Sequence, residues 1–338
     1  ELFESRLSVL IGPAGTGKTT LLQVLCNEPT VKANGILMLA PTGKARVRME
    51  EQIKIRGAQT IAQFLLPLDR YDPQTGIYRL SMQDKVDAGK TVIIDEASML
   101  TEEQFAAVLN ALKGMDRLIL VGDPRQLPPI GTGRPFLDIV NLLAPKNIET
   151  IFPRIGSGYA ELTIRRRQIG QDRADLLLAE WFAGRPVDAG ADIIWEEVQK
   201  QENSGTVRLV RWETPDEFQR KLLEVLADEL ALSGKDDWAG FEQSLGGVLF
   251  NDNVYFNAKY QDRPGSASKI ENWQILSPVR ASAHGVDSVN RFIQATFRKR
   301  TKEFATQIYR KIPKPMGREG ILYGDKVIQV LNQRRYQV

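Results

Sequence analysis

A phosphate-binding pattern lies close to the start of the chain. Residues 12–19 read Gly-Pro-Ala-Gly-Thr-Gly-Lys-Thr and fit G-x-x-x-x-G-K-[ST] without a mismatch. Glycines let backbone N–H groups turn inward around phosphates, and a helix that begins here adds partial positive charge. Lys18 is expected to reach the β- and γ-phosphates of ATP, and the Thr19 hydroxyl to bind Mg²⁺. The residues predicted to bind ATP are Gly12, Pro13, Ala14, Gly15, Thr16, Gly17, Lys18, Thr19 and Thr20.

Two adjacent acids follow an apolar run further along the chain. Val92-Ile93-Ile94 leads into Asp95 and Glu96. Such a strand end can place the first acid on a metal ion and the second beside an attacking water, as its general base. An Asp-Glu pair alone would more usually be a solvated strand end. Beside a phosphate loop, the pair predicts a hydrolytic site in which Asp95 binds Mg²⁺ and Glu96 is catalytic.

A third polar loop follows the apolar run Leu118–Val121. It begins Gly122-Asp123-Pro124-Arg125-Gln126. In a doubly wound sheet the carboxyl ends of the strands line the ligand crevice, so this loop should face the same nucleotide. A glutamine there can hydrogen-bond the γ-phosphate or position water, and we predict Gln126 as a catalytic residue. The following Pro128-Pro129 pair is also compatible with a rigid turn alone.

The elements that position these residues indicate a doubly wound α/β fold. Four short apolar runs are typical of strands buried on both faces of a parallel sheet. They are Leu7–Ile11, Ile36–Ala40, Val92–Ile94 and Leu118–Val121. The stretches Thr19–Leu25 and Glu102–Leu112 between them are long enough for crossover helices. The fold class that follows is an α/β P-loop NTPase.

The pattern changes in two places. Residues 66–90 contain Asp72-Pro73-Gln74-Thr75-Gly76 between Tyr71 and Tyr78, which predicts a hairpin-like insertion. Beyond Pro153 we expect helices over 173–183, 215–232 (with Thr214 as N-cap) and 286–297. Strands are expected over 208–212, 274–277 and 326–331. The stretch 234–268 is expected to be loop-rich.

Composition limits the class of protein. A chain of 338 residues suggests two domains, and 42% apolar with 26% charged residues is typical of a globular protein. No apolar run approaches the length that crosses a bilayer, so no membrane partner is expected. The single cysteine, Cys26, fits a reducing, cytoplasmic setting and a buried apolar position. Basic side chains dominate residues 291–338, which indicates either a nucleic-acid contact or a solvated face.

Several motifs in order resemble superfamily 1 helicases. They are G-P-A-G-T-G-K-T-T (12–20), A-P-T-G-K-A (40–45), V-I-I-D-E-A-S-M-L (92–100) and V-G-D-P-R-Q-L-P-P-I-G (121–131). Within that superfamily the chain looks most like the RecD-like group of superfamily 1B, which includes the exonuclease V alpha subunit. The resemblance implies two RecA-like lobes with parallel sheets, residues 1–155 and 156–338, with ATP between them and the insertion 66–90 as a wedge or pin.

The resemblance also assigns residues outside the nucleotide loops. Pro41, Thr42 and Gly43, then Thr60 and Ile61, match segments that contact the DNA backbone, although Ala62 replaces the histidine often found there. Arg167 matches an arginine finger of the second lobe, with the register uncertain by one residue within Arg165–Arg167. The segments expected last in the family have no match in residues 300–338, so the second lobe is expected to be incomplete.

The function implied is an ATP-dependent DNA helicase or translocase. It would move 5′→3′ on single-stranded DNA or DNA junctions, in DNA repair or recombination, with a possible nuclease or repair-complex partner. Two alternatives stay open: a P-loop motor that does not unwind duplexes, and a non-catalytic helicase-like subunit of a nuclease complex. The complete set Lys18, Asp95, Glu96 and Gln126 argues against the second.

Overall fold

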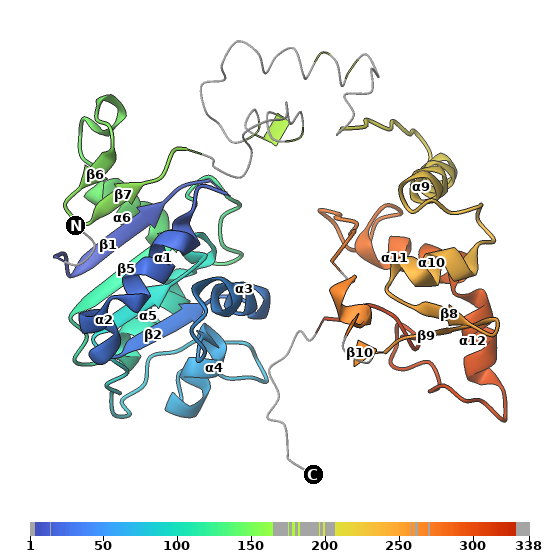
Figure 1. The fold of residues 1–338 in the computed structure, drawn as a ribbon, viewed down its shortest axis with the longest axis horizontal. Coiled ribbons are helices and arrows are strands. Elements are labelled where there is room, and N and C mark those ends of the chain that lie inside the picture. Colours follow the sequence, from blue (N-terminus) through green and yellow to red (C-terminus); the bar gives the residue numbers. More distant parts are fainter. Residues whose placement is uncertain are drawn as a thin grey trace. The chain divides into compact units, whose positions relative to one another are not determined.

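A computed structural model of the chain describes residues 4–13, 15–164 and 207–328 except 258, 261, 262 and 270, together with isolated positions between 175 and 199. The described residues form two compact units, one ending before residue 209 and the other beginning there. Each unit is described by itself (Figure 1).

The first unit is built on a seven-stranded sheet with strand order β3-β2-β4-β5-β1-β7-β6. Its strands are β1 (Leu7–Ile11), β2 (Ile36–Ala40), β3 (Gln59–Thr60), β4 (Thr91–Ile94), β5 (Arg117–Gly122), β6 (Arg154–Gly156) and β7 (Tyr159–Glu161). All neighbours are parallel except β6, which is antiparallel to β7. The four predicted strands are present, and the α/β P-loop fold class is confirmed.

Helices cover both faces of this sheet (Figure 1). One face carries α1 (Lys18–Asn27), α2 (Pro29–Ala33) and α3 (Gly43–Ile53). The other carries α4 (Ile61–Leu65), α5 (Glu102–Ala111) and α6 (Pro135–Leu143). Short 3-10 turns lie at Leu66–Leu68, Ala97–Met99 and Ile148–Thr150. Strands buried on both faces need apolar side chains at every position, which is why β1, β2, β4 and β5 are nearly unbroken apolar runs.

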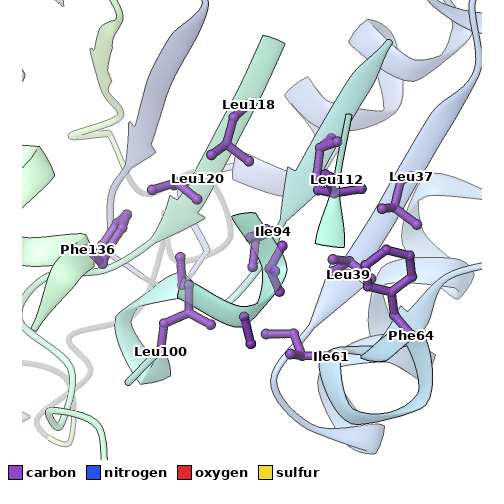
Figure 2. Close-up of a cluster of buried hydrophobic side chains, with 14 of the residues drawn as sticks. Leu37, Leu39, Ile61, Phe64, Ile94, Leu100, Leu112, Leu118, Leu120 and Phe136 are labelled. Atoms are coloured by element: carbon purple, nitrogen blue, oxygen red, sulfur yellow. The ribbon is translucent and has the colours of Figure 1, made fainter. Parts of the chain in front are cut away.

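Two apolar cores hold the layers together. On the α4–α6 face, Leu39, Ile94 and Leu120 from three neighbouring strands meet Ile61 and Phe136 from the helices (Figure 2). On the other face, alternate strand residues pack against α1 and α3, and Cys26 lies in this core with no exposed surface. Burial raises the pKa of the Cys26 thiol to about 11, as expected of a structural cysteine.

The insertion 66–90 is anchored by a buried arginine. Arg70 has no exposed surface; its Nε donates to Asn110 Oδ1 at 2.7 Å and its guanidinium to the carbonyls of Leu68 and Gln83 at 2.8 Å each. Beyond it, Tyr71 and Tyr78 form an antiparallel bridge with ring centroids 4.7 Å apart. The turn between them closes where Gly76 N–H donates to the Asp72 carbonyl. The arginine thus ties the base of the insertion to the end of α5.

Helices are the longest regular elements among the described residues of the second unit. It contains α9 (Pro215–Glu229), α10 (Trp238–Ser244), α11 (Val286–Phe297) and α12 (Lys299–Thr306), with a 3-10 turn at Ser266–Ser268. Two antiparallel hairpins accompany them, β8 (Val248–Phe250) with β9 (Asn253–Tyr255) and β10 (Lys259–Tyr260) with β11 (Arg263–Pro264). Thr214 caps α9 as predicted, its Oγ1 accepting from Glu217 N–H at 3.2 Å.

A buried ion-pair cluster joins the helices of this unit. Arg298 is 2% exposed and contacts Glu242 Oε1 at 2.6 Å and Asp325 Oδ1 at 3.3 Å. Burial raises the pKa of Glu242, and the Arg298 charge opposes that shift. Beside the cluster, the rings of Phe241 and Phe297 stack 4.5 Å apart and form a small core with Leu226.

Several predictions for the second half are wrong. Residues 208–212 and 274–277 are not strands, and neither are residues 326–328. Each run is apolar enough for a strand, but no ladder partner lies beside it in the described part of the chain. The stretch 234–268 was expected to be loop-rich and instead holds α10 and both hairpins. The predicted helix 173–183 lies mostly outside the described residues, as does the end of the strand predicted over 326–331.

Candidate nucleotide-binding site

The phosphate loop follows the carboxyl end of β1. Gly17 is the N-cap of α1 and has φ 95°, a left-handed conformation that favours glycine. At Gly12 the constraint is space, because a Cβ atom would lie 2.6 Å from the Leu162 carbonyl oxygen. Thr16 is buried and its hydroxyl donates to the Pro13 carbonyl at 2.9 Å. These constraints explain the small residues, and the loop ends at a helix N-terminus that favours phosphate.

Lys18 is the first residue of α1 and turns back into the loop. Its ammonium donates to the carbonyls of Gly12 at 2.5 Å and Pro13 at 3.1 Å. Burial lowers the pKa of Lys18, while the charges of Asp123, Glu96 and Asp95 raise it. The lysine therefore lies in the field of three carboxylates that come from two other strand ends.

The acid pair follows β4, which lies next to β5 in the sheet. Asp95 N–H donates to the Leu39 carbonyl at 3.0 Å, and Asp95 Oδ1 accepts from Glu96 N–H at 2.9 Å. Burial, the largest cause, raises the pKa of Asp95 to about 6. Glu96 has φ 51° and ψ 38°, a left-handed conformation that costs a residue with a Cβ and that is concentrated at functional sites.

The third loop follows β5, which is paired with β1 so that Ile11 lies opposite Gly122. Asp123 is 8% exposed; its Oδ1 accepts from Arg125 N–H at 3.1 Å, and its carbonyl accepts from Gln126 N–H at 3.1 Å. Gln126 itself is exposed. Because β4, β5 and β1 are neighbours, the phosphate loop, the acid pair and this turn meet at one edge of the sheet.

Sequence reasoning missed two carboxylates at this edge. Asp123 follows a buried strand in the same way as Asp95, and that signal could have identified it. Glu161 ends β7, beside Ile11 of β1, and is 8% exposed. It accepts from Arg125 at 3.3 Å, from Arg154 at 3.1 Å and from Tyr159 Oη at 3.3 Å. Burial first, and then the Glu161 charge, raise the pKa of Tyr159 to about 12, so the phenol stays protonated and donates.

The predicted magnesium ligands suit that ion by their chemistry. A hydroxyl and a carboxylate are hard oxygen donors of the kind Mg²⁺ prefers. Asp95 is a partly buried acid whose pKa is raised mainly by burial, and the charge of a divalent cation beside it would favour its ionised form. Thr19 is partly buried at the start of α1, one residue beyond Lys18. These two residues therefore fit the ion.

The segments predicted to contact DNA lie at the same edge but on other strands. Thr42 is the N-cap of α3 and accepts from Ala45 N–H at 3.2 Å; Thr60 caps α4 in a capping box with Gln63. β3 pairs with β2, which places the two segments side by side. The Ile61 side chain has no exposed surface, so contact there would fall to the backbone. Thr60 is 7% exposed, whereas the space beside Gly43 is open.

Some predicted site residues lie outside the described residues. They are Ala14 of the phosphate loop, the arginine finger Arg167 and its neighbours Arg165 and Arg166. The roles given to Lys18, Asp95, Glu96 and Gln126, like the DNA contacts, stay predictions that the geometry accommodates.

Comparison with known proteins finds a family match within the first unit. Residues 2–169 match the family model described as AAA domain. Over these residues the chain is similar to that family. The matched region includes all three loops at the sheet edge together with Glu161, and the match ends just beyond Arg167.

Two curated relatives confirm the expected RecD-like relationship. RecBCD enzyme subunit RecD of Mycolicibacterium smegmatis is 27% identical over 220 residues, which cover 56% of this chain and 39% of that protein. The ATP-dependent RecD2 DNA helicase of Deinococcus radiodurans is 34% identical over 137 residues, 40% of this chain and 18% of that protein. The chain thus matches less than half the length of these two relatives.

Among solved structures, Bacteroides Pif1 bound to ssDNA aligns with 68% of this chain and 54% of its own, at 20% identity and a TM-score of 0.38.

No helix in the described part of the chain is long and apolar enough to cross a bilayer.

Proposed function

We propose that this chain is the motor of an ATP-dependent DNA helicase that translocates 5′→3′ on single-stranded DNA. The observation that carries the proposal is the convergence of three loops, from β1, β4 and β5, at one edge of the seven-stranded sheet. Lys18, the Asp95–Glu96 pair and the Asp123–Gln126 turn supply the groups that ATP hydrolysis requires. The name of the Deinococcus radiodurans relative, an ATP-dependent DNA helicase, supports the same class.

In the proposed reaction a water oxygen attacks the γ-phosphorus while the bond to the β–γ bridging oxygen breaks. Glu96 accepts the proton of that water, which makes it a stronger nucleophile. Lys18 neutralises phosphate charge, and Gln126 hydrogen-bonds the γ-phosphate or the water. Arg167 supplies a positive charge that stabilises the transferring group. Mg²⁺, held by Thr19 and Asp95, would neutralise charge on the β- and γ-phosphates.

DNA would run along the β2 and β3 side of the same edge. The N-terminus of α3, at Thr42 and Gly43, presents backbone N–H groups that suit a DNA phosphate. The basic stretch 291–338 would add electrostatic attraction. Contacts of this kind do not read base edges, so we expect binding that is insensitive to sequence. A RecBCD-like nuclease partner belongs to this proposal, since one relative is a RecBCD subunit.

The proposal is tested by anisotropy titrations of unrelated single-stranded and blunt duplex oligonucleotides at three salt concentrations, together with strand-separation assays with ATP. We expect similar affinities among single strands, a preference over blunt duplex, and log K falling with log[salt] by ~0.7 per phosphate contacted. Tight binding of one oligonucleotide with little salt dependence would contradict the proposed substrate. ATP-driven translocation without strand separation would assign the chain to non-unwinding motors.

A further inference from the structure

Glu161 joins two parts of the first unit that are far apart in the sequence. It is the last residue of β7, and its side chain is 4% exposed. Both carboxylate oxygens are used: Oε1 accepts from Arg125, and Oε2 accepts from Arg154 and Tyr159. A buried carboxylate with three donors is held in one orientation, and it in turn holds the donors.

Arg125 lies inside the turn that carries Gln126. The backbone of this turn is closed by two hydrogen bonds to Asp123, one from Arg125 N–H and one from Gln126 N–H. The Gln126 side chain is exposed and adjoins residue 125, so its direction depends on how the turn is anchored. Among the described residues, the ion pair of Arg125 with Glu161 connects this turn to strand β7.

The next residue along the chain touches the phosphate loop. Leu162 N–H donates to the Ile11 carbonyl at 2.8 Å, and Leu162 packs so closely over Gly12 that no Cβ fits there. The end of β7 therefore contacts both the loop that would hold the phosphates and the turn that carries Gln126. From the same point the chain leaves the sheet toward residues 165–206.

We propose that Glu161 is a positioning residue, which fixes Gln126 toward the γ-phosphate by holding Arg125. This inference rests on the proposed ATPase function. A purely structural role of Glu161 would be to neutralise the charge of Arg154. This arginine of β6 pairs with the same carboxylate but lies outside the turn that carries Gln126. Arg154 therefore provides a matched control for Arg125.

The experiment compares the intact wild-type protein with Glu161→Gln, Arg125→Gln, Arg154→Gln and Gln126→Ala, and with the double variant Glu161→Gln/Gln126→Ala. It measures DNA-stimulated kcat, KM for ATP, and affinities for a non-hydrolysable ATP analogue and for ADP with aluminium fluoride, which mimics the transferring phosphate. Unfolding temperatures establish that each variant is folded.

We expect kcat to fall on the order of tenfold or more in Glu161→Gln and Arg125→Gln, because a displaced catalytic group loses its alignment. Affinity for ADP with aluminium fluoride should weaken in the same two variants, with KM and analogue affinity nearly unchanged. Arg154→Gln should lower kcat much less than Arg125→Gln, because Arg125 and Tyr159 still hold the Glu161 carboxylate. The double variant should be no slower than Gln126→Ala, since both changes remove one function.

Three results would overturn the inference: an Arg154→Gln loss as large as that of Arg125→Gln, additive losses in the double variant, or wild-type kcat in folded Glu161→Gln. Failure of the proposed function looks different, because the wild-type protein would then neither turn over ATP nor bind ADP with aluminium fluoride. That outcome would remove the inference as well.

Discussion

We predict that Asp95, the proposed Mg²⁺ ligand, lowers the stability of the folded, nucleotide-free protein. Its carboxylate is held at the end of β4, where burial raises its pKa from 3.8 to about 6. Replacement by asparagine preserves the shape and the acceptor for Glu96 N–H, and removes the partly buried charge. We therefore expect Asp95→Asn to stabilise the nucleotide-free protein while it abolishes the dependence of nucleotide binding on Mg²⁺.

The magnitude follows from the pKa difference between the folded and unfolded states. The folded value is the higher one, so the native state binds the proton more tightly and loses stability as the group ionises. A shift of about two pKa units corresponds to roughly 3 kcal/mol of the free energy of unfolding. Below pH ~4 the Asp95 carboxyl is protonated in both states, so it does not destabilise the native state. The destabilisation grows between pH ~4 and ~6, as the carboxyl ionises, and is complete above that window.

The assay is denaturant unfolding of both proteins from pH 4 to pH 8 with EDTA present. The advantage of Asp95→Asn should rise across the window and then level off. Asp116→Asn, at an exposed aspartate before β5, serves as the control for a general effect of removing a negative charge. Equal stability of Asp95→Asn and wild type at pH 7, or an advantage that does not change with pH, would refute the reasoning.

Further expectations concern other parts of the chain. Lys18→Ala should weaken binding of a fluorescent ATP analogue and abolish turnover, because the ammonium neutralises phosphate charge; unchanged affinity and rate would exclude this loop as the site. Arg70→Met should lower the free energy of unfolding by roughly 2–4 kcal/mol, because the hydrogen bonds of the buried guanidinium to Asn110 and to the Leu68 and Gln83 carbonyls are lost. Chemical denaturation measures this, and an effect below 1 kcal/mol, on the scale of exposed sites, would contradict it.

The central strands of the sheet could be predicted from the sequence alone. β1, β2, β4 and β5 are buried on both faces, so each had to be an apolar run, and the polar residues after them had to meet at one edge. β7 escaped prediction because it has three residues and ends in Glu161, whose burial depends on arginines from β6 and from the turn after β5. Such a long-range charge cluster leaves no periodic signal in the sequence.

The second unit shows where local reasoning fails. Residues 274–277 contain the apolar pair Ile275-Leu276, but a strand requires a partner strand whose backbone donates and accepts hydrogen bonds along its length, and apolarity does not supply one. The β8–β9 hairpin did carry a sequence signal, since its turn residues are Asn251 and Asp252, residue types that tolerate the positive φ they adopt, 46° and 57°. Two such residues between short strands are typical of a tight hairpin turn.

The central claim is that Glu96 acts as the base of an ATPase whose nucleotide is held by the loop at residues 12–19. The most direct test is steady-state DNA-stimulated ATP hydrolysis by Glu96→Gln, measured beside its affinity for ATP. We expect affinity close to that of the wild type and kcat lower by on the order of 10²–10⁴, because the water loses its base. Hydrolysis at the native rate by the folded variant would show that another group performs this role and would contradict the account.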